Sequence, residues 1–381
     1  MLLSIQNVVV MEIIHIISGK IETKKRHKIN RAVEHIVQCQ NVNTAKVSIW
    51  CIDYDSDPIF FRKKTKFLNF SKSQQLLKLN KNLKSEIKLK NIDTVFHIHG
   101  AFILEYYLIT KLLAGTGRNY VYTPHCILNG KQFNITNLKN YFQLKIIERK
   151  IIQNAVNIQC TEISESQLIL MHFPTVTTSL ISLPPNKKQR QFQFKPLRKR
   201  ETLIFGFSGK ISIEENGLDL LIKGFSRYRS KLKGDALLWI IGSGEDTNVL
   251  KRYAQSTSEA NYIHFHCPTN EDEKTNYIAN IDVIFSTARE YSDSSQILEA
   301  AKLGIPSVTN KESTICENVS QYDAGLVLSK NRITDIATAM KRMEEKFLVN
   351  SIRNQGENAL KMMQKEYNWD QVSANIQSLY P

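Results

Sequence analysis

Short apolar runs rich in β-branched residues alternate along the whole chain with longer amphipathic stretches. Such runs are typical of buried parallel strands, and the longer stretches have the spacing of helices. In the first half, the pattern predicts strands at 12–18, 46–52, 94–100, 120–125 and 156–160. It predicts helices at 28–39, 71–90, 104–113, 140–154 and 162–172. This alternation indicates an α/β domain with a parallel, doubly wound sheet.

A second α/β pattern follows residues 187–200, which are polar, basic and without clear periodicity. It predicts strands at 202–208, 236–241, 262–266, 281–285, 307–309 and 324–328. The predicted helices are 218–228, 249–254, 271–278, 296–303, 333–347, 352–363 and 369–379. We therefore expect a first domain at 1–186, a linker at 187–200 and a second domain at 201–360. The last segment, 361–381, is expected to be helical and to pack back on the first domain.

The stretch 281–309 combines a strand, a polar loop, a helix and the start of another strand. Gly304 and Pro306 stand where a helix ends, and Ser294 and Ser295 stand where one begins. Free backbone N–H groups and the positive end of the helix dipole would therefore form an anion site, suited to a diphosphate. Glu299 lies one turn further on, within reach of a sugar hydroxyl. An ordinary α/β crossover with a capped helix would show the same pattern.

Composition places the chain among globular proteins of two domains. Its 381 residues fit two domains of roughly 150–200 residues each, and an apolar fraction of 42% is ample for two cores. The six cysteines form no CxxC pair, which favours a reduced, cytoplasmic protein over a disulfide or zinc framework. No apolar run reaches the ~20 residues that a membrane span needs.

Basic residues are concentrated in the first half of the chain. Residues 1–200 hold 31 Lys and Arg against 12 Asp and Glu, whereas residues 201–381 hold 20 against 24. An anionic membrane surface is one partner that such a half would attract. A solvated surface without a partner explains the same charge. Nucleic acid is not expected, because no zinc finger, helix-turn-helix or aromatic-interleaved basic motif is present.

Taken together, several segments resemble the group-4 family of retaining GT-B-fold glycosyltransferases. These segments occur in the order typical of the family, end in LEAAKLGIPSV, and lie at 94–100, 120–126, 185–186, 207–221, 238–245 and 281–308. The resemblance implies a GT-B fold, in which two Rossmann-like domains face a central cleft. It also implies a nucleotide-sugar donor bound mainly by the second domain and an acceptor held by the first.

The resemblance also assigns roles to single residues. The catalytic candidates that it implies are His125, Lys210 and Glu290. The donor-binding candidates are Gly209, Asn216, Gly242, Ser294, Ser295, Gln296 and Glu299. On the acceptor side the candidates are Gly19, His99 and Gly100. No metal ligands are implied. A lone histidine after a proline is often structural, so a second reading of His125 stays open.

The two expected cations depart from the family pattern. Lys210 stands where the family has an arginine, so the charge is kept but the planar fork is lost. Asn216 stands where the family has a lysine, and an asparagine brings no charge. Losing a charge-assisted contact to phosphate could cost roughly 2–4 kcal/mol of transition-state stabilisation.

The expected pair of glutamates is also irregular. Counting back from Glu299 by the family spacing reaches Tyr291, and Glu290 stands one residue early. Either the loop carries an insertion and Glu290 still reaches the sugar, or Tyr291 or Asp293 takes its place.

The expected function is therefore transfer of a sugar, with retention of configuration, from a nucleotide donor to a hydroxyl of a lipid-linked surface glycan. We expect no cofactor and no metal, because a helix dipole and basic side chains can stabilise the leaving diphosphate. The expected place is the cytoplasm, at the inner face of the plasma membrane. Two alternatives stay open, namely a degenerate GT-B protein that binds a sugar nucleotide or partner without transfer, and a GT-B epimerase.

Overall fold

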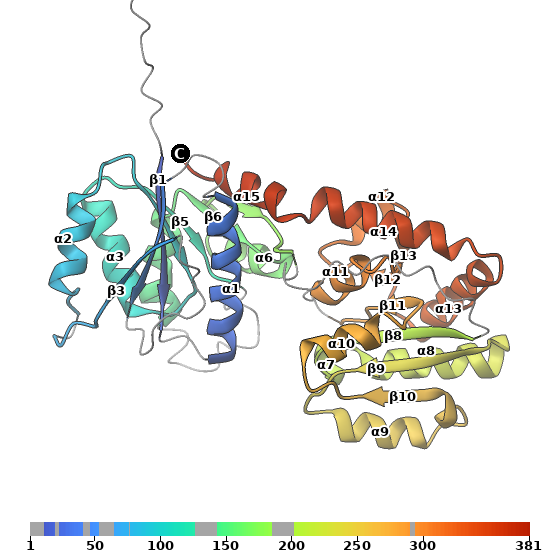
Figure 1. Ribbon diagram of the computed structural model, residues 1–381. Coiled ribbons are helices and arrows are strands. Elements are labelled where there is room, and N and C mark those ends of the chain that lie inside the picture. The colour runs from blue at the N-terminus through green and yellow to red at the C-terminus, as the bar shows by residue number, and fades with distance from the viewer. Residues whose placement is uncertain are drawn as a thin grey trace, which may run out of the picture. The chain divides into compact units, whose positions relative to one another are not determined.

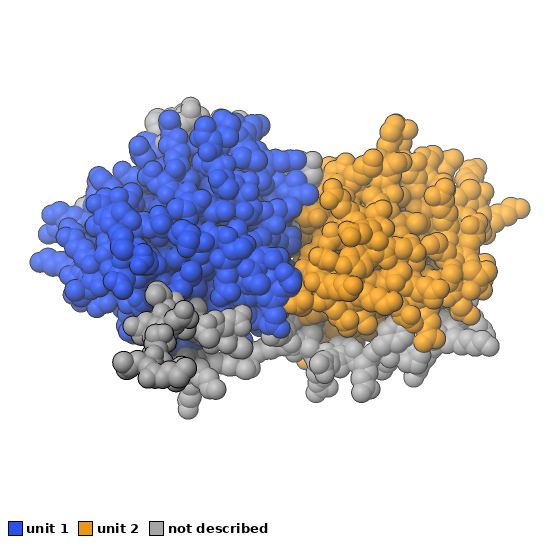
Figure 2. Space-filling view, turned by 90° about the horizontal axis from the view of Figure 1, so that it is seen from above, with its two compact units in different colours: residues 1–186, 369–381 blue, residues 187–368 orange. Residues whose placement is uncertain are grey.

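The computed structural model describes residues 11–19, 23–40, 46–52, 65–75, 77–125, 143–184, 202–289 and 294–381, with the backbone alone at 23–28, 143–145 and 164. The chain divides into two compact units, shown in different colours in Figure 2. Unit 1 comprises Met1–Asn186 and Trp369–Pro381, and unit 2 comprises Lys187–Asn368. The expected linker at 187–200 lies outside the described residues.

Unit 1 is built on a parallel sheet of seven strands in the order β3-β2-β1-β4-β5-β6-β7. The strands are β1 (Glu12–Ser18), β2 (Lys46–Ile52), β3 (Lys66–Phe70), β4 (Val95–His99), β5 (Tyr120–Thr123), β6 (Asn157–Cys160) and β7 (Thr178–Leu180). In β1 and β2 every residue after the first is buried, as expected for a sheet that helices cover on both faces.

Helices cover the sheet of unit 1. They are α1 (Thr23–Gln40), α2 (Lys81–Leu89), α3 (Leu104–Gly115), α5 (Arg149–Asn154), α6 (Ile163–His172) and α15 (Trp369–Gln377). In Figure 1, α1 lies on one side of the strands and α2 and α3 lie on the other. The last helix, α15, packs against α1, and the rings of Trp369 and His35 are 4.8 Å apart. The C-terminal segment is therefore part of the core of unit 1.

Unit 2 contains a parallel sheet of six strands in the order β10-β9-β8-β11-β12-β13. The strands are β8 (Leu203–Ser208), β9 (Ala236–Ile241), β10 (Ile263–His266), β11 (Val283–Phe285), β12 (Ser307–Asn310) and β13 (Gly325–Leu328). The helices are α7 (Ile213–Asn216), α8 (Leu218–Leu232), α9 (Thr247–Gln255), α10 (Glu271–Ile278), α11 (Ser295–Ala301), α12 (Cys316–Gln321), α13 (Ile333–Leu348) and α14 (Ile352–Glu366). Two parallel Rossmann-like sheets confirm the predicted fold class.

Several elements differ from the sequence predictions. The segment 71–90 was predicted to be one helix, but the helix α2 covers only Lys81–Leu89, and the strand β3 ends just before the segment. The predicted helix 140–154 begins within the described residues as a π-helix at Gln143–Glu148 and continues as α5. The helix α14 continues to Glu366, so the segment that joins unit 1 starts at Trp369 rather than at 361. No helix in the described part of the chain is both long and apolar enough to cross a membrane.

Candidate functional site

After β8 and β9 the backbone of the two following loops lies in close contact, at Gly209 and Ile211 on one side and Gly242 and Gly244 on the other. We call this contact the glycine crossing. Gly209 and Gly242 have φ angles of +151° and +139°. A Cβ atom added to Gly242 would lie 1.9 Å from the carbonyl oxygen of Gly209, and one added to Gly244 would lie 2.1 Å from that of Ile211. No side chain fits at either position, so the loops after β8 and β9 lie in direct contact. In an open parallel sheet this edge is where ligands bind.

The helix α11 begins beside this crossing. Ser294 is its N-cap residue, but the Oγ atom of Ser294 bonds Ser313 and Thr314 at 3.1 and 2.7 Å instead of capping the helix. Gln296 is 7% exposed, and its Nε2 atom donates to Ser286 at 3.3 Å. Its Oε1 atom has no partner among the described residues and lies 3.8 Å from the position of a Cβ atom on Gly209. The structure thus brings Gly209, Gly242 and Gln296 together.

Lys210 and Asn216 both lie in the segment between β8 and α8, Lys210 just after β8 and Asn216 as the last residue of α7. The Nζ atom of Lys210 forms ion pairs with Glu215 at 3.0 Å and Glu245 at 3.3 Å. The hydrogen bond with the Glu215 carboxylate raises the pKa of Lys210 above its ordinary value. Asn216 donates from Nδ2 to the carbonyl oxygen of Lys210 at 2.8 Å. A phosphate would therefore compete with two carboxylates for this ammonium group.

Arg289 is a cation of the same region that the sequence reasoning missed. It follows β11, and its guanidinium group contacts Asp219 at 2.8 Å and the carbonyl oxygen of Ile213. Its Cγ atom lies 3.6 Å from the position of a Cβ atom on Gly217, the residue after Asn216. A positive charge therefore lies next to the loop that the missing family lysine would occupy. The sequence signal was the position of Arg289 in the polar segment that follows a buried strand, four residues after Phe285.

Glu299 is paired with a lysine that the sequence reasoning also missed. The Nζ atom of Lys274, in α10, lies 2.7 Å from the Oε2 atom of Glu299, and both side chains are largely buried. Burial lowers the pKa of the nearby Lys302, although the Glu299 carboxylate acts in the opposite direction. Glu299 is thus a fixed carboxylate rather than a solvated one, and its contact with a ribose stays a prediction. Glu290, Tyr291 and Asp293 lie outside the described residues.

The four first-domain candidates lie at strand ends of unit 1. The N–H of Gly19 donates to Ile52 at 2.8 Å, and that of Gly100, whose φ is +103°, donates to Thr123 at 2.9 Å. His125 is half-buried after β5 in a left-handed conformation with φ of +57°. Its Nε2 atom lies 3.0 Å from the Nδ1 atom of His99. Three of the candidates, His99, Gly100 and His125, therefore meet at one place.

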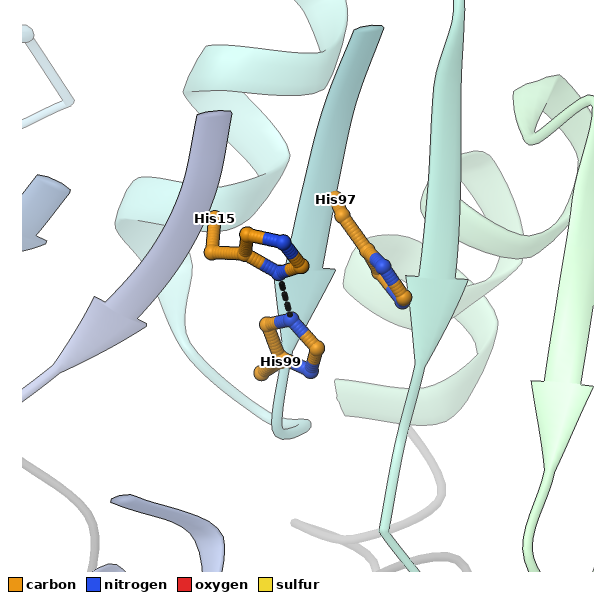
Figure 3. Close-up of side chains that lie close together, drawn as sticks. All are labelled: His15, His97 and His99. Atoms are coloured by element: carbon orange, nitrogen blue, oxygen red, sulfur yellow. Dashed lines mark hydrogen bonds between the residues drawn. The ribbon is translucent and has the colours of Figure 1, made fainter. Parts of the chain in front are cut away.

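His99 also belongs to a buried group of three histidines, drawn in Figure 3. His15 and His97 are the other two, and they face each other in the register of β1 and β4. One nitrogen atom from each of the three lies within 4.8 Å of the others, close enough to hold a metal ion. Burial lowers the pKa of His15 to about 4 and holds the pKa of His97 and His99 well below the ordinary range.

Hydrogen bonds already occupy every ring nitrogen of this group. His15 and His99 bond each other at 2.8 Å, and their other nitrogens bond Gln40 and His125. The two nitrogens of His97 bond Tyr380 and Thr123, at 3.0 and 2.7 Å. A metal ion would therefore have to break hydrogen bonds to gain its ligands. The satisfied hydrogen bonds, together with the lowered pKa values, favour three neutral imidazoles over a metal site.

Comparison with known families identifies unit 2. Residues 188–362 match the family model described as glycosyl transferases group 1. Unit 2 is a group 1 glycosyltransferase domain. The resemblance expected from the sequence is thereby confirmed. No curated protein matches the chain in sequence.

Solved structures extend the likeness to both units. A glycosyltransferase from Rickettsia africae superposes with a TM-score of 0.69 at 11% identity, covering 98% of each chain. HepE from Anabaena, in complex with UDP, gives 0.67 at 13% identity and covers 97% of this chain and 99% of its own. The lipopolysaccharide galactosyltransferase WaaB gives 0.67 at 14% identity with the same coverage. At this identity the likeness shows the GT-B fold.

Proposed function

We propose that the protein is a glycosyltransferase whose second unit binds a nucleoside diphosphate sugar at the carboxyl ends of β8, β9 and β11. The observation that carries the proposal is Gln296, whose buried Oε1 atom lacks a partner in the described structure and lies beside Gly209. Buried polar atoms in folded proteins nearly always have partners, and a sugar hydroxyl would supply one here. HepE has been solved with UDP and with UDP-glucose, which makes uridine nucleotides the first donors to test.

The cations of unit 2 suit the charge that this reaction develops. Cleavage of the bond between the anomeric carbon and the phosphate oxygen leaves its electron pair on the diphosphate. Preorganised positive charge at that oxygen is usually the largest catalytic contribution. Lys210 would give up Glu215 or Glu245 to meet the phosphate, and Arg289 would supply the second charge that Asn216 lacks. We propose transfer with retention of configuration and without a metal or cofactor.

The acceptor is proposed to be a lipid-linked glycan, with unit 1 resting on an anionic membrane. The surface around α2 supports this, because Leu77, Leu89 and Ile92 are 60%, 78% and 53% exposed. Four exposed lysines lie near them in the sequence, namely Lys78, Lys81, Lys84 and Lys88. Exposed apolar side chains among lysines suit the boundary between headgroups and acyl chains.

Binding without transfer is a second candidate function, which one observation favours. Lys210, the cation expected at the diphosphate, is neutralised by two carboxylates, and Asn216 provides no charge. A protein with these features could bind a sugar nucleotide and leave it intact. Donor hydrolysis and transfer assays separate the candidates, since binding with no turnover supports this one.

Titration calorimetry with UDP and UDP-sugars tests the binding site. Gln296→Met removes the unpartnered oxygen while keeping the side-chain length, so we expect donor affinity to fall at least tenfold, about 1.4 kcal/mol. Gln355→Met is the matched control. Gln355 is also buried with an unpartnered oxygen, but its Nε2 atom bonds Gly325 at the start of β13, the opposite edge of the sheet. Equal donor affinity in wild type and Gln296→Met would contradict the proposed site.

Liposome sedimentation tests the membrane surface. The variant Lys81→Glu, Lys84→Glu, Lys88→Glu should release the protein from anionic vesicles, because each basic residue near headgroups contributes about 1 kcal/mol. Lys361→Glu, on the exposed face of α14, is the control. Binding that is absent from wild type, or unchanged in the triple variant, would contradict this surface.

A further inference from the structure

Acidic side chains outnumber basic ones in the two segments that form the glycine crossing of unit 2. These segments are 209–217, between β8 and α8, and 242–246, between β9 and α9. Together they contain one ammonium group and four carboxylates, those of Lys210, Glu214, Glu215, Glu245 and Asp246. Phosphate sites in proteins usually concentrate positive charge, so this composition is unusual for a place that is proposed to bind a diphosphate.

Two of these carboxylates contact the single ammonium group. The Oε1 atoms of Glu215 and Glu245 lie 3.0 and 3.3 Å from the Nζ atom of Lys210, so one positive and two negative charges leave a net charge of −1. A phosphate oxygen that bonds the same ammonium group at about 2.8 Å lies at most about 6 Å from either carboxylate oxygen. This separation is shorter than the screening length of about 10 Å at 0.1 M salt.

The backbone of both glutamates is fixed at this place. The N–H of Glu215 donates to the Oγ atom of Ser212, the N-cap residue of α7, at 3.3 Å. The carboxylate of Asp246, next to Glu245, accepts from the N–H of Ile213 at 2.7 Å. The segment after β9 is therefore attached to the α7 segment, and each glutamate side chain rotates about a fixed backbone position.

The charge of the ligand differs between donor and product. In a nucleoside diphosphate sugar each phosphate carries an ester bond, and the diphosphate has two negative charges. During transfer the bond between the anomeric carbon and the phosphate oxygen breaks, and its electron pair stays on the oxygen. The acceptor oxygen bonds the anomeric carbon, and the acceptor proton passes to solvent. The free nucleoside diphosphate then has a third negative charge above its second phosphate pKa of about 6.

The transition state does not yet carry this extra charge. While the bond to the leaving oxygen breaks, positive charge on the anomeric carbon balances the negative charge that develops on the diphosphate. The total charge of the bound sugar nucleotide therefore stays constant until the sugar has been transferred. A net negative charge beside the diphosphate thus opposes the free product more than it opposes the reaction.

We propose that Glu215 and Glu245 are specificity-determining residues that select the sugar-linked donor over the free nucleoside diphosphate and promote release of that product. The inference rests on the proposed function, in which Lys210 contacts the diphosphate. Repulsion by the two carboxylates is stronger for a ligand with three negative charges than for one with two. The independent observation that points to a ligand here is the Oε1 atom of buried Gln296, which lies beside Gly209 without a partner among the described residues.

Titration calorimetry with two uridine ligands of similar size separates charge from shape. In slightly alkaline buffer UDP has the third charge on its terminal phosphate, and a methyl ester on that phosphate removes one negative charge. The quantity to compare is the dissociation constant of the ester divided by that of UDP. We expect it to rise about threefold in Glu215→Gln or Glu245→Gln and about tenfold in the double variant, from Coulomb repulsion at about 6 Å in water.

Two further variants control for the loss of an ion pair and for the length of the side chain. Glu357→Gln breaks an exposed ion pair with Arg353 on α14 and should leave the ratio at its wild-type value. Glu245→Asp keeps the charge on a shorter side chain and should retain most of the selectivity. Added salt should move the wild-type ratio toward that of the double variant, because salt screens exposed charges. An unchanged ratio in the double variant would overturn the inference.

Magnesium tests the other use that carboxylates have beside a diphosphate. The titrations are made in EDTA and repeated with magnesium chloride. We expect UDP binding and the difference between wild type and double variant to persist in EDTA. If wild type bound UDP only with magnesium, and the double variant lost that binding, the carboxylates would hold a cation and the inference would be overturned.

Product inhibition gives a second readout in a transfer assay. The inhibition constant of UDP, divided by the KM of the donor, should be about tenfold lower in the double variant than in wild type, and Glu357→Gln should match wild type. Equal inhibition in the double variant and wild type would contradict a role in product release. Failure of wild type to bind UDP, GDP, ADP, dTDP or their sugar nucleotides would refute the proposed function as well. Binding with unchanged selectivity would refute the present inference alone.

Discussion

The two units share a parallel α/β architecture but differ in what lies around their strand ends. In unit 1 the central strands carry buried imidazoles, joined by hydrogen bonds to the C-terminal segment. In unit 2 the corresponding edge is formed by glycine backbone, with Lys210 and Arg289 beside it. Unit 1 therefore presents buried, uncharged polar groups, whereas unit 2 presents bare backbone and ion-paired cationic side chains. The first arrangement suits recognition of neutral hydroxyl groups and the second suits a diphosphate.

Acid should destabilise unit 1 far more than unit 2. The pKa values of His15, His97 and His99 are lowered in the folded state, so these residues take up three protons on unfolding below pH 6.5. Burial raises the pKa of Glu148 to about 7, so this carboxyl group releases one proton on unfolding above pH 4.5. The net uptake is two protons, and stability falls by about 2.7 kcal/mol for each pH unit between pH 6.5 and 4.5.

Urea unfolding at several pH values measures this effect. Two of the three tryptophans, Trp50 and Trp369, lie in unit 1, and the third, Trp239, lies in unit 2. Fluorescence of a Trp239→Phe variant therefore reports unit 1. A stability of unit 1 that stays constant from pH 7 to pH 5 would contradict the buried neutral histidines.

Adding one methyl group at the glycine crossing should disrupt unit 2. We expect Gly242→Ala to destabilise this unit by about 3 kcal/mol and to abolish nucleotide binding, because of the clash with Gly209 and the positive φ. Gly115→Ala is the control, since nothing lies within 4 Å of the added atom at the end of α3. Calorimetric melting and UDP titration provide the readouts. Normal UDP affinity in Gly242→Ala would show that the contact between the Gly209 and Gly242 loops takes no part in nucleotide binding.

Removing the buried carboxyl group of unit 1 should steepen its acid response. Glu148 accepts hydrogen bonds from the N–H of Phe102 at 2.6 Å and the hydroxyl of Tyr122 at 2.7 Å. In Glu148→Gln only the three histidines change protonation, so the slope between pH 6.5 and 4.5 should rise by about 1.4 kcal/mol per pH unit. An unchanged slope would show that Glu148 is ionised in the folded protein.

Glu299 tests whether the charges of unit 2 serve the donor. Glu299→Ala should weaken donor binding about tenfold, or about 1.4 kcal/mol, if its carboxylate bonds the ribose. Glu357→Ala, which breaks an exposed ion pair on α14, should leave affinity unchanged. Isothermal titration with UDP compares the two variants. Unaltered affinity in Glu299→Ala would assign Glu299 to its ion pair with Lys274 alone.

Helices and strands could be predicted from the sequence where their apolar residues form an unbroken buried run or follow a clear cap. The bounds of β1, β2, β9 and α10 match the predictions, because apolar runs and an Asn270 cap mark them clearly. The strand β3 was missed because KFLNF is only partly buried at the edge of the sheet. The short helices α7 and α12 were also missed, because neither is long enough to show a helical spacing of apolar residues.

The sites were harder to predict because their partners are distant in sequence. The pairing of His15 with His97 depends on the register of β1 and β4, which no local pattern reveals. Similarly, Lys274 reaches Glu299 from another helix, and Glu245 reaches Lys210 from the loop after β9. The residues at strand ends could be predicted from the sequence, whereas the groups that hold them are visible only in the structure.

Hydrogen exchange measured by mass spectrometry, with and without UDP, tests the central claim most directly. The account predicts that nucleotide slows exchange in peptides covering 207–217 and 286–300 of unit 2, while peptides covering 46–52 and 157–160 of unit 1 stay unchanged. Protection confined to unit 1, or no protection at saturating UDP and UDP-sugars, would contradict a nucleotide site at the glycine crossing.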